Sequence, residues 1–367
     1  MHLKQQRTVL VTGNMGYIGP LVVRQLVNAI PDVYVIGADS GYFAHCLTGA
    51  NWLPERLVHE QHFCDIRDLS DDLLGRVDAI IHLAAISNDP MGKAFEAPTD
   101  AINSTASGDF ARRASRAGVR SFVFASSCSI YGSAGADART EDAELNPLTA
   151  YARSKVHMEK VLEDLADDEF TATCLRFATA CGWSPRTRLD LVLNDFVASA
   201  VANGRIEVLS DGTPWRPLVH IEDIARALTW AIDRPAADSG KFLAVNVGND
   251  EWNYQIRDLA KAVAELVPGT EISINENAAP DKRSYRVSFE LLKRVAPANL
   301  IRRSLEDTVR ELHANLQTMG FADPNFRESR YIRLSELRKL RGLGVLDMDL
   351  RWTDRPRMGV NSKNTLG

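Results

Sequence analysis

The sequence lacks the charge and the apolar runs that binding a nucleic acid or a membrane requires. Its formal net charge is −5 at pH 7, so no basic excess attracts polyanions or anionic lipid. No apolar run approaches the length of a membrane span. The first residues, MHLKQQRTVLVTG, show neither the apolar stretch nor the small-residue cleavage site of a secretory signal. We therefore expect a cytoplasmic protein without nucleic-acid or membrane partners.

Cysteine is also scarce. The chain has five cysteines, an odd number at irregular spacing, at positions 46, 64, 128, 174 and 181. They match neither a disulfide framework nor the ligand spacing of a zinc site. A reduced setting without a bound metal is the simplest interpretation.

The first half of the sequence alternates β-branched runs with helical patterns. Strands are expected at residues 7–12, 33–38, 77–83, 121–125 and 172–177, with helices among them at 17–28, 102–117 and 150–167. Such alternation is typical of an α/β fold in which helices cover both faces of a doubly wound, Rossmann-type parallel sheet.

A glycine-rich turn joins the first expected strand to the first helix, with the spacing G-x-x-G-x-x-G. Its glycines allow a tight turn, close approach of a pyrophosphate and close helix–strand packing. The free N–H groups of the helix N-terminus then face the phosphates. A tight turn without a ligand is the competing interpretation. The residues predicted here to bind a dinucleotide are Gly13, Asn14, Met15, Gly16, Tyr17, Ile18 and Gly19.

Asp39 lies 20 residues after Gly19, at the end of the second expected strand. A carboxylate at this distance accepts hydrogen bonds from the adenosine ribose and repels a 2′-phosphate. The pattern therefore predicts NAD, rather than NADP, as the cofactor. The alternative is a turn residue before Ser40-Gly41.

The sequence pattern changes after Gly182, where a basic loop, an apolar helical stretch and two short strands follow one another. This change indicates a second, smaller lobe. We predict an NAD-binding Rossmann domain over residues 1–182 that the chain rejoins near 220–250, and an interleaved α/β substrate lobe over 183–320. A C-terminal extension over 321–367 follows, and its tail after Gly342 is expected to be partly extended.

Tyr151 and Lys155 are four residues apart, on one face of an expected helix that Thr149 can cap. A nearby ammonium favours the phenolate and lowers the pKa of tyrosine from about 10. The pair is therefore a candidate proton acceptor. The competing interpretation is that both residues simply lie on a solvent-exposed helix face, which is the commoner case for this spacing. Ser127 follows the strand at 121–125, at the sheet edge where open α/β folds bind ligands. The competing interpretation of Ser127 is that it belongs to a hydroxyl-rich turn with no ligand.

Four motifs occur in order: Thr-Gly-x-x-Gly-x-x-Gly, His82-Leu83-Ala84-Ala85, Ser126-Ser127 before Tyr131-Gly132, and Tyr151-x-x-x-Lys155. The sequence, over roughly Thr8 to Leu312, resembles the extended short-chain dehydrogenase/reductase family, particularly its UDP-galactose 4-epimerase branch. The resemblance implies that Tyr151 is the acid/base, that Ser127 orients the substrate hydroxyl, and that Lys155 holds the nicotinamide ribose. It implies further cofactor contacts at Asp65, Ile66, Leu83, Ala84, Ala85 and Asn103.

Looser matches suggest the substrate side of the site. Arg216 and Arg283 resemble arginines that grip a sugar-nucleotide diphosphate, because guanidinium groups suit phosphate oxygens. A surface salt bridge is the alternative for each arginine. The segment Ser87-Asn88-Asp89-Pro90 would line the sugar pocket, and Cys128 and Asn194 are further candidate contacts. Cys128 would have either a chemical role or the role of a small buried filler.

The dehydratase branch carries Thr-Asp-Glu where this sequence has Ser127-Cys128-Ser129. Without those carboxyl groups, elimination of water is not expected. We therefore predict an NAD-dependent nucleotide-sugar epimerase. The alternatives are an NAD(P)-dependent 4-ketoreductase or dehydrogenase acting on a nucleotide sugar, and a non-catalytic dinucleotide sensor. Family members commonly pair through the helices that correspond to residues 102–117 and 150–167, which implies a homodimer.

Overall fold

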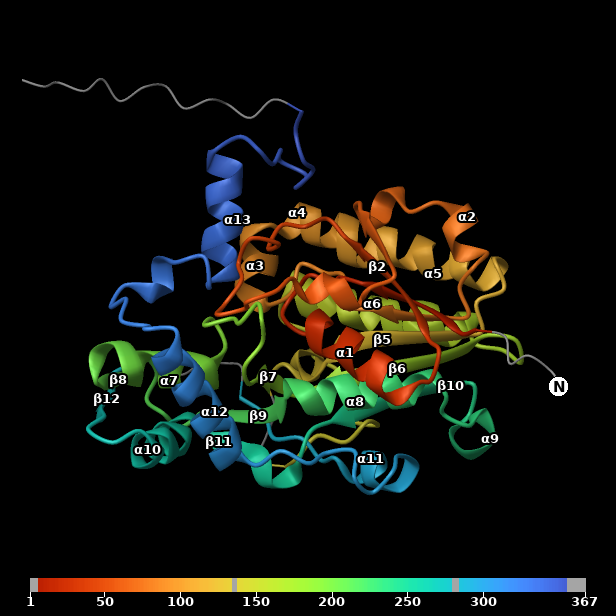
Figure 1. Ribbon diagram of the computed structural model, residues 1–367. Helices are drawn as coiled ribbons and strands as arrows, with labels where there is room; N and C mark the ends of the chain where they lie inside the picture. Colours follow the sequence, from red (N-terminus) through yellow and green to blue (C-terminus); the bar gives the residue numbers. More distant parts are fainter. Residues whose placement is uncertain (1–5, 134–136, 279–283, 355–367) are drawn as a thin grey trace, which may run out of the picture.

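A computed structural model describes residues 6–133, 137–278 and 284–354. Its centre is a seven-stranded parallel sheet (Figure 1). In spatial order the strands are β10 (Phe242–Val247), β6 (Thr171–Phe177), β5 (Ser121–Ser127), β4 (Ala79–His82), β1 (Thr8–Thr12), β2 (Tyr34–Asp39) and β3 (Glu60–Phe63). The order reverses between β1 and β4, which confirms the predicted doubly wound α/β fold.

The alternation of side chains along β1 explains why both faces of the sheet are covered. Val9 and Val11 pack with the helices α1 (Gly19–Ala29) and α8 (Ile221–Ile232) on one face. Leu10 belongs to the opposite core. Helices α5 and α6 bury apolar side chains in that core; they span Ser107–Arg116 and Ala150–Leu165. A strand that is apolar on both faces stays buried only between two helical layers.

A second, smaller core is built from the residues beyond β6. It contains a three-stranded sheet and a two-stranded sheet, covered by helices. The strands are β7 (Thr179–Cys181), β9 (Trp215–His220), β11 (Asn253–Gln255), β8 (Arg205–Val208) and β12 (Glu271–Ile274), and the helices are α7 (Val192–Asn203), α10 (Ile256–Leu266) and α12 (Leu305–Thr318).

Short elements connect these layers. They are α2 (Asp71–Leu74), α3 (Asp89–Ala94), α4 (Glu96–Thr99), a π-helix (Asp100–Ala106), α9 (Ala236–Ser239), α11 (Glu290–Val295) and 3₁₀ turns at Pro54–Leu57, Ile66–Asp68, Cys128–Tyr131, Asp250–Trp252 and Phe326–Glu328.

The C-terminal extension contains a helix, α13 (Arg333–Gly342), for which no prediction was made from the sequence. Leu337 and Leu340 of this helix are buried in the core that also holds α5 and α6. The chain then turns back toward the loop after β2, where the Trp352 indole N–H donates to the carbonyl oxygen of Ser40 at 2.5 Å. The extension therefore reaches from the small lobe to the large one (Figure 1).

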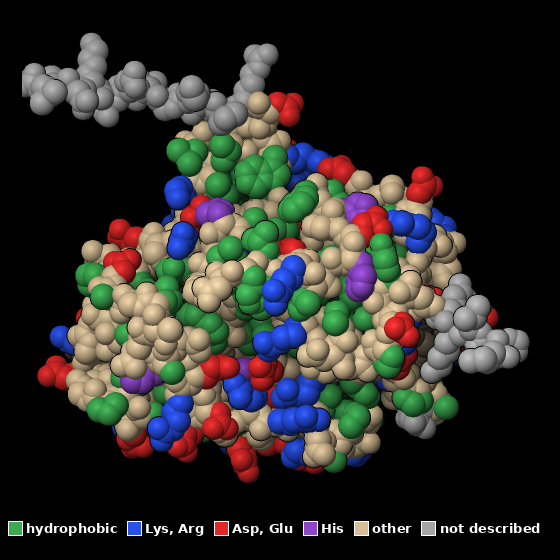
Figure 2. Space-filling model, viewed as in Figure 1, with side chains coloured by type: hydrophobic (Ala, Val, Ile, Leu, Met, Phe, Trp, Pro, Cys, Tyr) green, Lys and Arg blue, Asp and Glu red, His purple; other side chains and the backbone are tan. Residues whose placement is uncertain are grey.

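Acidic and basic side chains are interspersed along the lower part of the face in Figure 2, in keeping with the small net charge. None of the described helices combines the length and the apolar character needed to cross a bilayer.

Candidate active site

A cavity of about 730 Å³ lies at the carboxyl ends of the central strands, between the sheet and the small lobe. Its wall includes the glycine loop, the segments that follow β2, β4 and β5, the start of α6 and parts of the small lobe. This is the edge at which open α/β sheets bind ligands. The glycine loop, Ser127, Tyr151 and Lys155 all line this one cavity.

The glycine loop is shaped so that only glycine fits at its tightest points. Gly13 has φ of +75°, and a Cβ there would lie 2.7 Å from the Ala84 backbone nitrogen. A Cβ on Gly19 would lie 2.2 Å from the Asn14 carbonyl oxygen. Helix α1 begins at Gly19 with no side-chain cap and no acidic residue in its first turn. Its N-terminus therefore suits an anion such as a pyrophosphate.

Asp39 lies at the end of β2, beside the glycine loop. One carboxylate oxygen accepts from the Met15 backbone N–H at 2.9 Å and the other from Gly41 at 2.7 Å. Burial raises the pKa of Asp39, and these two hydrogen bonds oppose the rise. Met15 and Asn14 do not line the cavity; the Asn14 amide instead donates to Gln61 at 2.7 Å. Their contribution is to the loop's shape.

Tyr151 lies in the first turn of α6, where Thr149 caps the helix by accepting from Ala152 at 3.1 Å. Its hydroxyl is hydrogen-bonded to Ser127. Lys155, one turn later, donates from Nζ to the Ala125 carbonyl at 2.7 Å and lies 5.3 Å from the centre of the Tyr151 ring. The strand end and the helix face thus hold the three groups together.

The expected lowering of the Tyr151 pKa is not found in this structure. Burial raises the pKa of Tyr151 to about 12, and the hydrogen bond from Ser127 opposes this only in part. Burial also lowers the pKa of Lys155 to about 7, so its amine is only partly charged at neutral pH. The predicted lowering required a fully charged ammonium beside the phenol. Desolvation of Lys155 leaves that charge incomplete, so its effect on the Tyr151 pKa is weakened.

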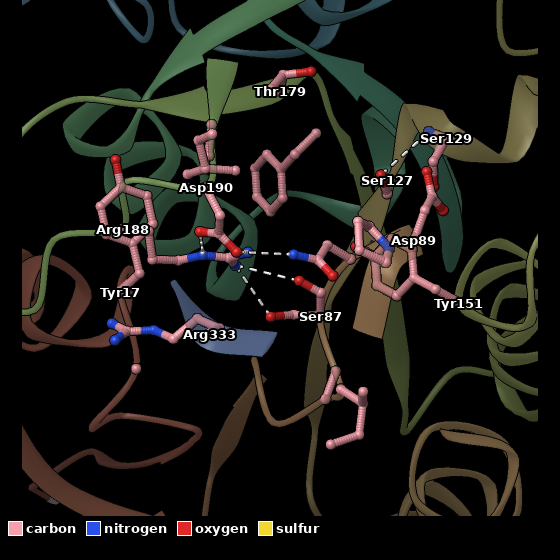
Figure 3. Close-up of a pocket in the computed structure, with 18 of the residues that line it drawn as sticks. Tyr17, Ser87, Asp89, Ser127, Ser129, Tyr151, Thr179, Arg188, Asp190 and Arg333 are labelled. Carbon is pink, nitrogen blue, oxygen red and sulfur yellow. Dashed lines mark hydrogen bonds and ion pairs between the residues drawn. The ribbon is translucent and has the colours of Figure 1, made fainter. Parts of the chain in front are cut away.

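The opposite side of the cavity carries an ion pair that sequence spacing did not single out. The Arg188 guanidinium donates to Asp190 at 2.9 Å and to the backbone and side-chain oxygens of Ser87 at 3.2 Å (Figure 3). Asn88 donates to Asp190 at 3.0 Å. This network fixes the segment after β4 that lines the cavity.

Asp89 belongs to the segment 87–90 that was expected to line the pocket, although no chemical role was expected for it. Its carboxylate accepts from the Thr149 hydroxyl at 2.6 Å and lies near Tyr151 and Ser129 in Figure 3. Both Asp89 and Ser129 line the cavity. The site therefore does contain a carboxyl group, supplied by the start of α3 rather than by the segment after β5.

Most of the other expected ligands also line the cavity. They are Gly16, Tyr17, Ile18, Asp65, Ile66, Leu83, Ala84, Ala85, Ser87 and Arg216. Within this set Asp65 forms a close ion pair with Arg67 at 2.6 Å. Arg216 donates to its own neighbour's carbonyl, that of Trp215, at 2.9 Å. Arg283 lies outside the described residues.

Three expected ligands lie behind the cavity wall. Asn103 is buried in the π-helix and brackets the backbone of Ile86, accepting from its N–H at 2.8 Å and donating to its carbonyl at 3.0 Å. Asn194 is buried and holds the loop around Gly182. Cys128 is buried and its thiol points to a backbone carbonyl of β6 at 3.1 Å. Burial raises the pKa of the Cys128 thiol far above its usual range, which favours the filler interpretation.

The sheet topology and the cavity at its carboxyl edge define a doubly wound α/β fold with a ligand-sized site at the point where the strand order reverses. The chain belongs to the NAD dependent epimerase/dehydratase family, whose sequence model matches residues 9–248. The UDP-glucose 4-epimerase of Bacillus subtilis is 27% identical over 287 residues, which cover 72% of this chain and 83% of that protein. The UDP-glucose 4-epimerase of Yersinia pestis is 30% identical over 59% of this chain and 70% of its own length.

Solved structures show the same fold. An NAD-dependent NDP-hexosamine 5,6-dehydratase of tunicamycin biosynthesis aligns with a TM-score of 0.72 at 22% identity, over 87% of this chain and 100% of that chain. A UDP-glucose 4-epimerase from Stenotrophomonas maltophila, solved with bound NAD, aligns with a TM-score of 0.70 at 23% identity, over 86% and 99% of the two chains. Family and fold are thus shown, and NAD is the cofactor of the family.

Proposed function

We propose that the protein is an NAD-dependent nucleotide-sugar epimerase that oxidises a sugar hydroxyl transiently, with Tyr151 as acid/base. The observation that carries this proposal is the meeting of Ser127, Tyr151 and Lys155 with the glycine loop in one cavity. The curated relatives that match most of the chain are UDP-glucose 4-epimerases, which supports the nucleotide-sugar substrate class.

The residues present fit NAD. The glycine loop leaves no room for a Cβ at Gly13, and the N-terminus of α1 offers uncapped N–H groups. Asp39 is held at the end of β2, where it can accept from ribose hydroxyls. When bound, NAD⁺ supplies the hydride acceptor and a positive charge.

The protein's own groups then handle the proton. Tyr151, whose hydroxyl is hydrogen-bonded to Ser127, removes the proton of the sugar hydroxyl and returns it at the end of the reaction. Ser127 positions that hydroxyl. Burial raises the pKa of Tyr151 to about 12, so a positive charge beside the phenol would favour removal of the proton.

Substrate binding is assigned to the small lobe and to the segment after β4. We propose that Arg216 contacts the diphosphate and that Ser87, fixed by Arg188, contacts the sugar. We also propose a homodimer. Apolar residues of the two helices expected to pair, Ile102, Phe110 and Val161, are buried in the core of the chain itself. The proposal therefore rests on the family resemblance.

Two other reactions remain candidates. A 4-ketoreductase or dehydrogenase would use the same three residues and exchange its cofactor in each turnover. Dehydration is favoured by one observation, the Asp89 carboxylate near Tyr151, which is a second acid/base group at the sugar end of the cavity (Figure 3).

The test is incubation of the purified protein with a panel of nucleotide sugars, with and without added NAD(H) or NADP(H), and product identification by NMR. An epimerase interconverts two epimers with no added cofactor. A protein that purifies empty and consumes NADH or NADPH in proportion to product would establish the reductase instead. The Tyr151→Phe variant serves as the inactive control.

A further inference from the structure

We propose that the C-terminal extension completes the dinucleotide site, with Arg333 of α13 binding a phosphate oxygen of the cofactor. This inference rests on the proposed cofactor site. It concerns a residue outside the stretch 9–248 that the family model matches. Arg333 nevertheless lines the same cavity as the glycine loop.

Arg333 lies on the side of the cavity where phosphates are expected. In Figure 3, Tyr17, Arg188 and Arg333 lie on one side of the view, and Ser127 and Tyr151 lie on the other. Two hydrogen bonds connect Arg333 to the glycine loop through the loop after β7. The Ser184 hydroxyl donates to the Tyr17 carbonyl at 2.7 Å, and two residues later the Arg186 carbonyl accepts from Arg333 at 2.7 Å.

The guanidinium group of Arg333 is held in place but only partly satisfied. It stacks on the Phe43 ring, 4.5 Å from the ring centre, and its Nη2 donates to the Arg186 carbonyl. The other terminal nitrogen, Nη1, is buried and has no hydrogen-bond partner among the described residues. An unsatisfied donor on a buried cation is costly, so a partner is expected.

The charges around Arg333 make an anion the fitting partner. The residue is 1% exposed, and within the described ranges no carboxylate lies within ion-pair distance of it. Its neighbours Arg186 and Arg188 already pair with Glu55 and Asp190. Burial and the charge of Arg188 lower the pKa of Arg333 to about 10, which still leaves it positive at neutral pH. A phosphate oxygen supplies both the charge and the missing acceptor.

The rest of the extension is fastened at the adenosine end of the same site. The Tyr42 hydroxyl donates to the Leu350 carbonyl, and the Trp352 indole donates to Ser40 at 2.5 Å. Arg67, the ion-pair partner of Asp65, donates to the Asp349 carbonyl at 3.1 Å. The extension therefore contacts the segments that follow both β2 and β3. This arrangement gives the protein a means of retaining its dinucleotide.

The experiment is calorimetric titration of the full-length chain, freed of copurified nucleotide, with NAD⁺, ADP-ribose and adenosine. We expect Arg333→Gln to weaken NAD⁺ and ADP-ribose by about 10- to 100-fold, the loss of a charged hydrogen bond, and to leave adenosine unchanged. Arg333→Lys, which keeps the charge, should lose less. Arg338→Gln, at an exposed position of the same helix, should bind like the wild type.

An unchanged affinity for NAD⁺ in Arg333→Gln, or an equal loss for adenosine, would overturn the inference. A crystal structure of the wild type with NAD gives a second readout that needs no substitution. It should place Nη1 within about 3.2 Å of a phosphate oxygen, and a longer separation contradicts the proposal. If the wild type binds no NAD, the proposed function fails instead; if it binds NAD and Arg333 is indifferent, this inference alone fails.

Discussion

Lys155 should make the cofactor-free protein less stable, although the proposed function requires it. The residue is 4% exposed, and burial lowers the pKa of its amine from 10.5 to about 7. At pH 7 the unfolded chain is fully protonated at this residue, whereas the folded chain is about half protonated. At about 1.36 kcal/mol per pKa unit, the mismatch costs about 4 kcal/mol of folding free energy.

Lys155→Met removes this cost and keeps a flexible side chain of similar length. It also removes the hydrogen bond to the Ala125 carbonyl, worth about 1 kcal/mol. We therefore expect the variant to be more stable than the wild type by about 3 kcal/mol at pH 7, and to be inactive.

The sign of the pH dependence follows from proton counting. A group whose folded pKa is lowered binds fewer protons in the folded chain, so wild-type stability rises as the pH rises from about 7 to 10.5. The advantage of the variant should shrink to about zero by roughly pH 9.5, where the remaining cost nearly equals the lost hydrogen bond.

The assay is urea denaturation of nucleotide-free protein at both pH values, because bound cofactor would add its own stability. Lys160→Met, at an exposed position of α6, is the matched control and should stay within about 0.5 kcal/mol of the wild type. A Lys155→Met variant that is less stable at pH 7, or whose advantage is the same at both pH values, would refute the reasoning.

Three further outcomes follow from the site. Tyr151→Phe should lower turnover by at least ~100-fold while cofactor affinity, measured by calorimetry, stays close to the wild type; near wild-type turnover eliminates the proposed acid/base. Asp39 should make NAD⁺ bind about 10-fold or more tightly than NADP⁺, because its carboxylate repels a 2′-phosphate; tighter binding of NADP⁺ in the same titration reverses the assignment. Arg216→Ala should raise the Michaelis constant about 10-fold or more through loss of a charged hydrogen bond; an unchanged constant removes Arg216 from the diphosphate site.

The fold could be predicted because its signals are local. The β-branched run ending at Thr12, the glycine turn and the helix after it each follow from neighbouring residues, and the structure shows them as β1, the loop and α1. Helix α13 of the C-terminal extension was not predicted. Leu337 and Leu340 are three residues apart, a helical spacing whose meaning becomes clear only when the core they contact is known.

The site was predictable only where residues belong to spaced motifs. Ser127, Tyr151 and Lys155 do, and they meet in the cavity. Arg188 lies in a loop and Arg333 in α13, far from the other site residues in the sequence. No fixed spacing between residues therefore predicts that they belong to the site. Asn103 shows that a residue predicted to bind the cofactor can have a structural role instead. Its side chain hydrogen-bonds both backbone groups of Ile86 and does not line the cavity.

The pKa values show a further limit of sequence reasoning. The spacing of Tyr151 and Lys155 indicates that the two side chains are close, but not that both are buried. Desolvation depends on everything packed around the pair, and here it outweighs their mutual interaction.

The central claim is that a sugar hydroxyl is oxidised and then reduced at the same carbon. The hydrogen removed from that carbon returns to it without exchanging with water. The measurement is the reaction of a nucleotide sugar in D₂O, followed by NMR or mass spectrometry of both epimers. The account predicts two epimers whose carbon-bound hydrogens remain protium. Deuterium on a sugar carbon would contradict it and would indicate carbon deprotonation, as in the dehydration that Asp89 could assist.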